Sequence, residues 1–169
     1  MIEVNEQVYR EVRDFLLREA ELLDNGAYRD WLGCLTEDIR YQVPVRVTRD
    51  RGVESEFVSE MGHLDEDHVS LEMRIMRLET EYAWAEDPPS RTRHFVSNIR
   101  VEPGDRDDEV KVKSNLLLYR TRGDDPHYDL LSAERHDVLR RINSQWKLAR
   151  RLVLLDQTTI GTHNLSILF

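Results

Sequence analysis

The sequence predicts one α+β domain in which N-terminal helices pack against a curved, mostly antiparallel sheet. Three observations support this prediction. Apolar side chains recur at helical spacing up to Leu35, and they alternate with polar ones in several runs after Pro89. The breaks between these later runs are short and rich in turn residues, as in antiparallel hairpins. The 169 residues contain no Gly/Ser linker and no internal repeat, so we expect residues 1–169 to form a single domain.

Two helices are expected at the start of the chain. The first spans residues 5–25, and Asn25-Gly26 ends it because both residues tolerate positive φ. The second is short and spans residues 27–35. Cys34 lies beside its apolar stripe, where we expect a small buried hydrophobe, with a reactive thiol as the alternative.

The middle of the chain gives weaker signals. Residues 39–47 alternate like a strand with one buried face, and Pro44 places this strand at a sheet edge or a bulge. Residues 48–64 have weak periodicity and predict a loop. Residues 66–79 fit a strand or a helix, but their Leu, Glu, Met and Arg content favours a helix, with Asp65 as its N-cap.

The second half of the chain predicts four strands, at residues 95–101, 110–118, 128–142 and 145–156. Alternation then assigns side chains to faces, since successive residues of a strand point to opposite sides. One face of the third strand carries Glu134, His136 and Val138, and one face of the fourth carries Trp146, Leu148, Leu152 and Leu154.

Composition and charge exclude several classes of function. The single cysteine cannot form an intrachain disulfide, and by itself it cannot hold a multi-cysteine zinc site or an iron–sulfur cluster. The formal charge of −9 and the pI of about 5.2 argue against nucleic acid or an anionic membrane as a partner. No apolar run approaches the ~20 residues that cross a bilayer, and the first residues lack signal-peptide features. We therefore expect a cytoplasmic protein.

The segment from His63 to His68 holds two histidines with three carboxylates between them, which are ligand types found in non-haem iron sites. On a helix, five residues turn the chain by about 500°, which leaves the two imidazoles roughly 140° apart. The acidic residues also suit the start of a helix. We therefore expect no metal ligands here.

Glu134 and His136 are the best candidates for acid–base chemistry. They share a strand face, so they could line a cavity or pair with Arg150. Two interpretations stay open: a satisfied polar network, which we favour, and an acid–base pair. His136 and Asp137 point to opposite faces of the strand and cannot form a dyad.

Two groups of residues predict contacts with other subunits. The segment 84–94, WAEDPPSRTRH, combines a Trp anchor, two acids, a Pro pair and two Arg. Its candidate interface residues are Trp84, Glu86, Asp87, Arg91 and Arg93. The second group is a row on the last two strands that we expect to be too charged for a core and suited to ion pairs within a homotrimer. Its members are Arg135, Asp137, Arg141, Lys147 and Arg151.

The first of these segments, continued as WAEDPPSRTRHFVSNI over residues 84–99, resembles the small (beta) subunit of aromatic-ring-hydroxylating dioxygenases of the biphenyl, benzene and naphthalene type. Three further stretches agree with that family: REAELLD at 18–24, EDIRYQVPV at 37–45, and LLDQTT to NLSILF within 154–169. The matching stretches run nearly from end to end. Residues 49–59 contribute nothing to the resemblance.

The resemblance implies a cone-shaped α+β fold like that of scytalone dehydratase and ketosteroid isomerase. It also implies an α3β3 hexamer in which this chain forms a beta trimer and is chiefly structural. The large subunit then carries the Rieske cluster and the mononuclear iron, and it adds O2 to an arene to give a cis-dihydrodiol. Electrons arrive from NADH through a reductase and often a ferredoxin. No catalytic, cofactor-binding or metal-binding residue is therefore expected in this chain.

Two other classes of function remain as alternatives. One is a free-standing dehydratase or isomerase on the same fold, with His136 and Glu134 in a pocket, and the other is a small-ligand-binding module. A subunit would co-purify with a larger iron protein, an isomerase would act alone, and a binding module would show a pocket without turnover. The arene is not predicted, because substrate choice lies mostly in the large subunit.

Overall fold

A computed structural model of the chain describes residues 1–46, 57–84, 90–158 and 167–169, with backbone alone for 57–61 and 81–84. Within these residues the elements follow the order α1 (Glu6–Asp24), α2 (Tyr28–Leu32), β1 (Leu35–Arg46), β2 (Phe57–Glu66), α3 (His68–Trp84), β3 (Arg91–Pro103), β4 (Glu109–Thr121), β5 (Tyr128–Ile142) and β6 (Gln145–Leu155). None of the described helices combines the length and apolar character needed to cross a membrane.

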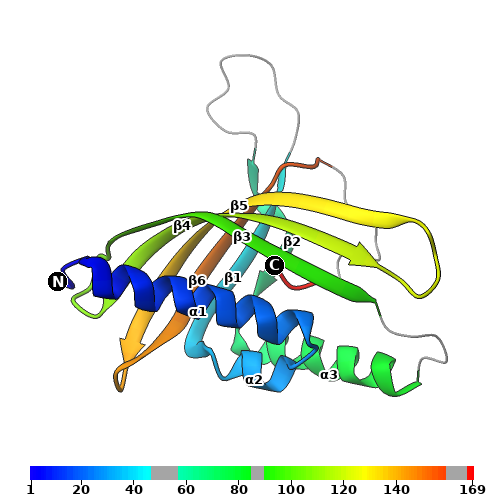
Figure 1. Cartoon of the computed structure of the whole chain (residues 1–169), viewed down its shortest axis with the longest axis horizontal. Coiled ribbons are helices and arrows are strands. Elements are labelled where there is room, and N and C mark those ends of the chain that lie inside the picture. The colour runs from blue at the N-terminus through cyan, green and yellow to red at the C-terminus, as the bar shows by residue number, and fades with distance from the viewer. Residues whose placement is uncertain (47–56, 85–89, 159–166) are drawn as a thin grey trace, which may run out of the picture.

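The strands form one six-stranded sheet in the order β2-β1-β6-β5-β4-β3. β1 and β6 run parallel, and every other pair of neighbours is antiparallel. The sheet curves over α1, and α2 and α3 lie together near one end of it (Figure 1). This arrangement confirms the predicted α+β class with a curved, mostly antiparallel sheet. We call the space between α1 and the sheet the cone interior.

The first helix has nearly the predicted bounds. Its residues Val8, Val12 and Leu16 are buried, as their spacing requires. The side chain of Asn5 caps it by accepting a hydrogen bond from the Val8 amide at 3.0 Å. Gly26 follows the helix with a φ of 68°, a conformation that glycine adopts without strain. The second helix is shorter than predicted.

The loop predicted for residues 48–64 is wrong in its second part, because residues 57–64 belong to β2. β2 is an edge strand that pairs with β1 alone, so a regular buried face is not imposed on it from both sides. The pairing of β1 with β2 shifts register on both sides of Pro44, which confirms the predicted bulge. Residues 48–56 lie outside the described part of the chain.

The third helix forms as predicted, but its N-cap is Asp67 and not Asp65. The Asp67 carboxylate accepts from the Ser70 amide at 2.9 Å, and the Ser70 hydroxyl accepts from the Asp67 amide at 2.9 Å. Asp65 still lies on β2, where it accepts a hydrogen bond from Arg40 of β1 at 2.7 Å. The acidic residues before the helix therefore divide between a cap and a cross-strand ion pair.

All four predicted strands of the second half are present, and β5 has the predicted bounds. The face predicted for the fourth strand is wrong beyond Leu148. Val138 of β5 faces Arg150 but Leu139 faces Leu148, so Ala149 is an extra residue on β6. This bulge reverses the alternation of side chains. As a result Trp146 and Leu148 point inward before the bulge, and Arg151, Val153 and Leu155 point inward after it.

The hydrophobic core fills the cone interior around α1. It draws on α1, α2, α3, every strand from β1 to β6 except β3, and residues 167–169. Its largest fully buried apolar side chains are Trp31, Tyr41, Phe169, Leu16, Ile39, Leu71, Ile75, Leu118, Leu139 and Leu148. Charged side chains lie among them, and these form the first feature of the candidate site.

Candidate functional site

Three charged side chains from three elements meet in the cone interior. Arg151 of β6 is 0% exposed, Glu19 of α1 is 1% exposed and Asp137 of β5 is 2% exposed. Arg151 Nη1 and Nη2 donate to the two oxygens of Glu19 at 2.6 and 2.9 Å. Its Nε and Nη2 donate to the two oxygens of Asp137 at 2.9 and 2.8 Å. One guanidinium therefore holds two carboxylates, each through two bonds.

Aromatic and main-chain groups complete this cluster, which we call the Arg151 network. Arg151 Nη1 also donates to the main-chain oxygen of Phe169 at 2.8 Å, so all five N–H groups of the guanidinium are used. Trp31 Nε1 donates to Glu19 at 2.9 Å. The Tyr41 hydroxyl accepts from the Phe169 amide at 2.6 Å and donates to the Phe169 oxygen at 3.1 Å.

Arg135 of β5 is a second buried cation beside the Arg151 network. It is 2% exposed, and its Nε donates to the Ser114 hydroxyl at 3.3 Å. Its Nη2 has no hydrogen-bond partner within the described part of the chain. Glu19 and Asp137 supply two negative side-chain charges against the two positive charges of Arg151 and Arg135.

The electrostatics of the interior favour the charged forms. Burial by itself would raise the pKa of Glu19, but the neighbouring Arg151 outweighs it and the pKa is lowered. Burial would lower the pKa of Arg151, yet Asp137 and Glu19 raise it well above its ordinary value. Burial raises the pKa of Tyr41 to about 12, so its hydroxyl stays protonated at neutral pH. Arg135 differs from these groups, because burial and the neighbouring Arg151 lower its pKa.

The structure corrects the expectation for the charged row. Arg135, Asp137 and Arg151 do not face a neighbouring copy, because all three are buried within this one chain. The premise that such a row is too charged for a core is wrong, since Glu19 arrives from α1 to balance it. The bulge at Ala149 also separates Arg151 from Lys147, which a regular strand would place on one face.

Arg141, the remaining member of the row, is held by its own chain near the end of β5. Its Nη2 donates to Glu11 at 2.7 Å, and its guanidinium lies 4.5 Å from the ring centre of Trp146. Trp146 Nε1 donates to the same carboxylate at 3.0 Å. The hydrogen bond from Trp146, followed by other contacts that include Arg141, lowers the pKa of Glu11.

A second buried polar pair, missed in the sequence, joins α1 to β3. His94 Nδ1 lies 2.5 Å from Asp24 Oδ1, and His94 Nε2 lies 2.8 Å from the carbonyl oxygen of Leu168. The His94 amide donates to the other Asp24 oxygen at 3.0 Å. Both ring nitrogens of His94 therefore lie at hydrogen-bonding distance from oxygen atoms of other elements. Alternation along β3 places His94 inward, but nothing in the sequence names its partners.

The segment 84–94 is described in part. Trp84 ends α3 and its side chain is not described, while Glu86 and Asp87 lie outside the described residues. Arg91 and Arg93 begin β3 and both are exposed. The contact role predicted for this segment therefore stays a prediction.

A group of large exposed apolar side chains lies beside Arg93 on the outer sheet face, away from α1. Arg93 is opposite Tyr119, Phe95 is opposite Leu117, and Tyr119 is opposite Leu130. The rings of Tyr119 and Tyr128 are 5.3 Å apart. We call this set the outer apolar cluster; its members and exposures are Phe95 (54%), Leu117 (40%), Tyr119 (37%), Tyr128 (61%) and Leu130 (49%). Contiguous exposed apolar surface is typical of interaction sites in general.

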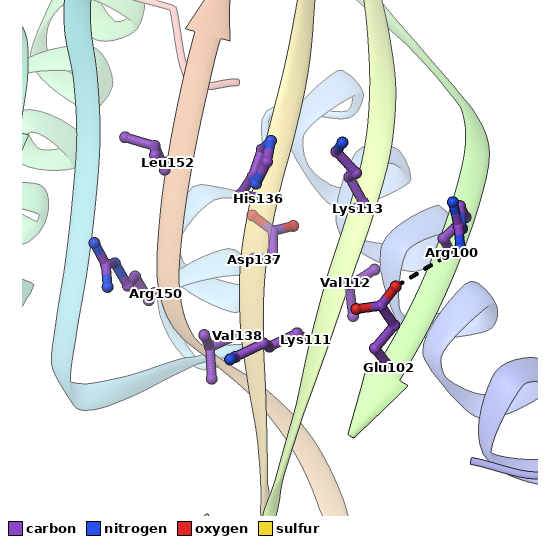
Figure 2. A pocket seen from close by; sticks show the side chains of 10 residues that line it. All are labelled: Arg100, Glu102, Lys111, Val112, Lys113, His136, Asp137, Val138, Arg150 and Leu152. Atoms are coloured by element: carbon purple, nitrogen blue, oxygen red, sulfur yellow. Dashed lines mark ion pairs between the residues drawn. The ribbon is translucent and has the colours of Figure 1, made fainter. Parts of the chain in front are cut away.

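A pocket of about 450 Å3 lies further along the same outer face, which we call the outer pocket. Figure 2 shows its side chains on β3, β4, β5 and β6, with the helices behind the strands. They are Arg100, Glu102, Lys111, Val112, Lys113, His136, Asp137, Val138, Arg150 and Leu152. Most of the charged residues among them are basic.

The predicted pair of Glu134 and His136 is formed on this outer face. His136 Nε2 lies 2.5 Å from Glu134 Oε1, and Lys113 Nζ lies 3.2 Å from the same oxygen. The hydrogen bond from His136 lowers the pKa of Glu134. His136 and Arg150 line the outer pocket, but Glu134 does not. The pair is open to solvent, with 44% of the His136 side chain exposed, which fits the polar-network interpretation.

The two histidines of the 63–68 segment belong to different elements. The prediction that both lie on one helix, about 140° apart, is therefore wrong. His63 lies on β2 and His68 begins α3. Burial lowers the pKa of His63. Among the described residues, no three His, Cys, Asp or Glu side chains are grouped so that they could hold a metal ion. Burial raises the pKa of the half-buried Cys34 thiol, which agrees with a packing role.

Comparison with known proteins places these features in a family. A family model described as "Ring hydroxylating beta subunit" matches residues 18–162. The chain is 34% identical to the biphenyl 2,3-dioxygenase subunit beta of Rhodococcus jostii (strain RHA1), over 98% of this chain and 91% of that protein. A chain in the structure of naphthalene 1,2-dioxygenase with indole bound superposes with a TM-score of 0.85 and 27% identity, covering 99% of this chain and 88% of that one.

A more distant structure shares the fold alone. It is a protein from Novosphingobium aromaticivorans assigned as a scytalone dehydratase, with a TM-score of 0.64, 16% identity, and coverage of 88% of this chain and 83% of that one. The cone-shaped fold expected from the family resemblance is thereby confirmed.

Proposed function

The chain belongs to the ring-hydroxylating dioxygenase beta-subunit family, and from that premise we propose that it is the non-catalytic small subunit of an enzyme that adds O2 to an aromatic hydrocarbon. The product is a cis-dihydrodiol, and the reaction belongs to the catabolism of aromatic hydrocarbons. The large subunit carries the chemistry, and this chain supplies a rigid base on which the large subunits are arranged. Three copies of each form an α3β3 hexamer in the cytoplasm.

The Arg151 network is the observation that supports a structural role. Proteins of this fold that act as acid–base enzymes need free titratable groups facing a substrate. Here the buried carboxylates of Glu19 and Asp137 are bonded to Arg151, and the five N–H groups of Arg151 all donate hydrogen bonds. The Glu134–His136 pair is exposed on the outer face and does not lie in an enclosed site, as the isomerase alternative would require.

The residues of this chain do not fit the cofactors that such an enzyme needs. A Rieske cluster takes two Cys and two His from its protein, whereas this sequence has one cysteine. The described His, Cys, Asp and Glu side chains form no group that could hold iron. We therefore assign the cluster and the mononuclear iron to the large subunit, with NADH, a reductase and in many cases a ferredoxin as the source of electrons.

The contact surface toward the large subunit includes the outer apolar cluster together with Arg91 and Arg93. Its apolar centre would be covered by an apolar surface of the partner, and the two exposed arginines at its edge suit carboxylates there. In the sequence, the segment 84–89 comes shortly before Arg91. Trp84, Glu86 and Asp87 remain interface candidates on that basis.

Co-expression with the large subunit tests the proposal. We expect a tagged copy of this chain to bring down a larger protein that contains iron and to restore arene dihydroxylation when reductase and NADH are added. The isolated chain should form a homotrimer and show no turnover. Dehydratase or isomerase turnover by this chain alone, or iron bound stoichiometrically to it, would overturn the proposal.

A further inference from the structure

The outer pocket collects positive charge on a chain whose formal net charge is −9. Four Lys or Arg residues and one His line it, against two acidic residues. One of those two, Asp137, has its carboxylate bonded to Arg151 in the cone interior, so it does not offset charge in the pocket. Glu102 is then the one carboxylate among the lining side chains that faces the cations.

The strand register places like charges directly opposite one another here. Arg100 is opposite Lys113, and Lys113 is opposite His136. Arg150 is opposite Arg40 of β1. Directly opposed like charges destabilise a sheet. Glu134 offsets part of this repulsion at Lys113 and His136, and Asp65 does so at Arg40. An anion bound beside Arg150 would offset more of it.

The acidic partners of these cations are weak competitors for such an anion. Lys111 lies 2.6 Å from Asp105, Lys113 lies 3.2 Å from Glu134, and Arg100 lies 3.7 Å from Glu102. The side chains in these three pairs are 42% to 81% exposed. Exposed pairs of this kind are worth little, so they exchange readily. Arg150 makes no ion pair with any described residue.

The floor of the outer pocket sets where an anion would lie. Val138 of β5 stands between Lys111 of β4 and Arg150 of β6, which are its direct neighbours in the sheet. Because adjacent strands are about 4.8 Å apart, the Cα atoms of Lys111 and Arg150 are separated by roughly 10 Å. Their long side chains can close on one oxyanion above Val138 (Figure 2).

We propose that the outer pocket binds an oxyanion, a carboxylate or a phosphate group, between Lys111, Lys113 and Arg150. Two sources can supply this chemistry: a small dissolved anion, or an acidic side chain of a neighbouring subunit. Binding of a small anion rests on the pocket alone and can be tested on the isolated chain, whereas the second source rests on the proposed assembly.

Calorimetric titration of the full chain with citrate and with inorganic phosphate, at constant ionic strength, tests the site. We expect saturable binding of one anion per chain. The double variant Lys113→Gln/Arg150→Gln should weaken it at least about tenfold, because it removes two charge-assisted contacts. Glu102→Gln should tighten binding, since it removes one of the competing carboxylates. Arg77→Gln on α3 is the matched control, which removes an exposed positive charge elsewhere and should leave binding unchanged.

The assembled complex then separates the two sources. If the complex binds citrate as the isolated chain does, the ligand is a small anion. If the complex does not bind citrate and the double variant weakens assembly, the ligand is an acidic side chain of a neighbouring subunit. Both results support an oxyanion site. Absence of saturable binding to the isolated chain, together with normal assembly of the double variant, would overturn it.

Discussion

At the scale of single residues, Arg151 decides how the interior is ordered. A buried ion pair is weak evidence for stability, because the desolvation of two charges offsets their attraction. Its geometric demand is strong, however: one guanidinium fixes α1, β5 and Phe169 relative to β6 through bonds of 2.6 to 2.9 Å. A subunit that serves as a rigid base gains from such a constraint.

We expect Glu19→Gln to lower the free energy of unfolding by about 3–5 kcal/mol at pH 7, because it leaves the buried Arg151 with half of its countercharge. Urea unfolding followed by circular dichroism measures this change. The pKa of Glu19 is lowered from its ordinary 4.5 in the folded state, so its contribution is complete above pH 4.5 and is lost as the pH falls through the lowered value. The difference from wild type should therefore shrink in acid.

The control for this substitution is Glu6→Gln at the start of α1. Glu6 forms a solvent-exposed ion pair with Arg10. Loss of this pair should change the free energy of unfolding by less than about 1 kcal/mol. An equal effect of the two substitutions would contradict the role given to the Arg151 network.

Tyr41 gives a spectroscopic test of the same network. Burial raises its pKa to about 12 from an ordinary value of 10, so the folded state favours the neutral phenol. The corresponding stability of roughly 3 kcal/mol is present below pH 10 and is lost as the pH rises through 12. We expect Tyr41→Phe to abolish an ultraviolet titration phase near pH 12. Persistence of that phase in the variant would assign it to another residue.

At the scale of elements, the alternation of apolar and polar residues predicts a strand best where the strand has a neighbour on each side. β5 lies inside the sheet, and its alternation gave its bounds in advance. β2 lies at an edge of the sheet, and its weak alternation of apolar and polar residues predicts a loop instead of a strand. The bulge at Ala149 was not predictable because it depends on how β6 pairs with β5, which is a property of two strands. Because of that single extra residue, Arg151 points into the cone interior and does not share a face with Lys147.

The N-terminus of α3 offers a direct comparison of the predicted and observed caps. We expect Asp67→Ala to destabilise the chain by about 1 kcal/mol, because it removes the hydrogen bond that the Asp67 carboxylate accepts from the Ser70 amide. Asp65→Ala should cost less, since Asp65 contributes an exposed ion pair to Arg40. Thermal unfolding of both variants measures the order. The reverse order would restore Asp65 as the cap.

At the scale of the whole molecule, the sequence predicted the family and the class of fold better than it predicted the surfaces. Segment 84–94 carried the family resemblance, yet the contact residues it suggested are described only at Arg91 and Arg93. The outer apolar cluster was not predicted, because its members come from three strands and meet only through their register. The basic outer pocket has the same origin, since Arg100, Lys113 and His136 look unrelated along the chain.

The proposed contact surface toward the large subunit can be tested at its centre. Leu117 is 40% exposed and lies opposite Phe95 in the outer apolar cluster, so Leu117→Glu places a charge where a partner must exclude water. We expect binding of the large subunit to weaken by about 2 kcal/mol or more, roughly thirtyfold, with the fold intact. Sedimentation velocity and pull-down with the tagged large subunit measure the loss.

Leu17→Glu on α1 is the matched control, because Leu17 is similarly exposed at 46% but lies on a helix away from the outer sheet face. It should assemble normally. If the chain has the proposed structural role, activity per iron in whatever complex the Leu117 variant still forms should equal that of wild type. If Leu117→Glu instead abolished the homotrimer and left large-subunit binding unchanged, the cluster would be the contact between copies of this chain, and its assignment to the large subunit would be wrong.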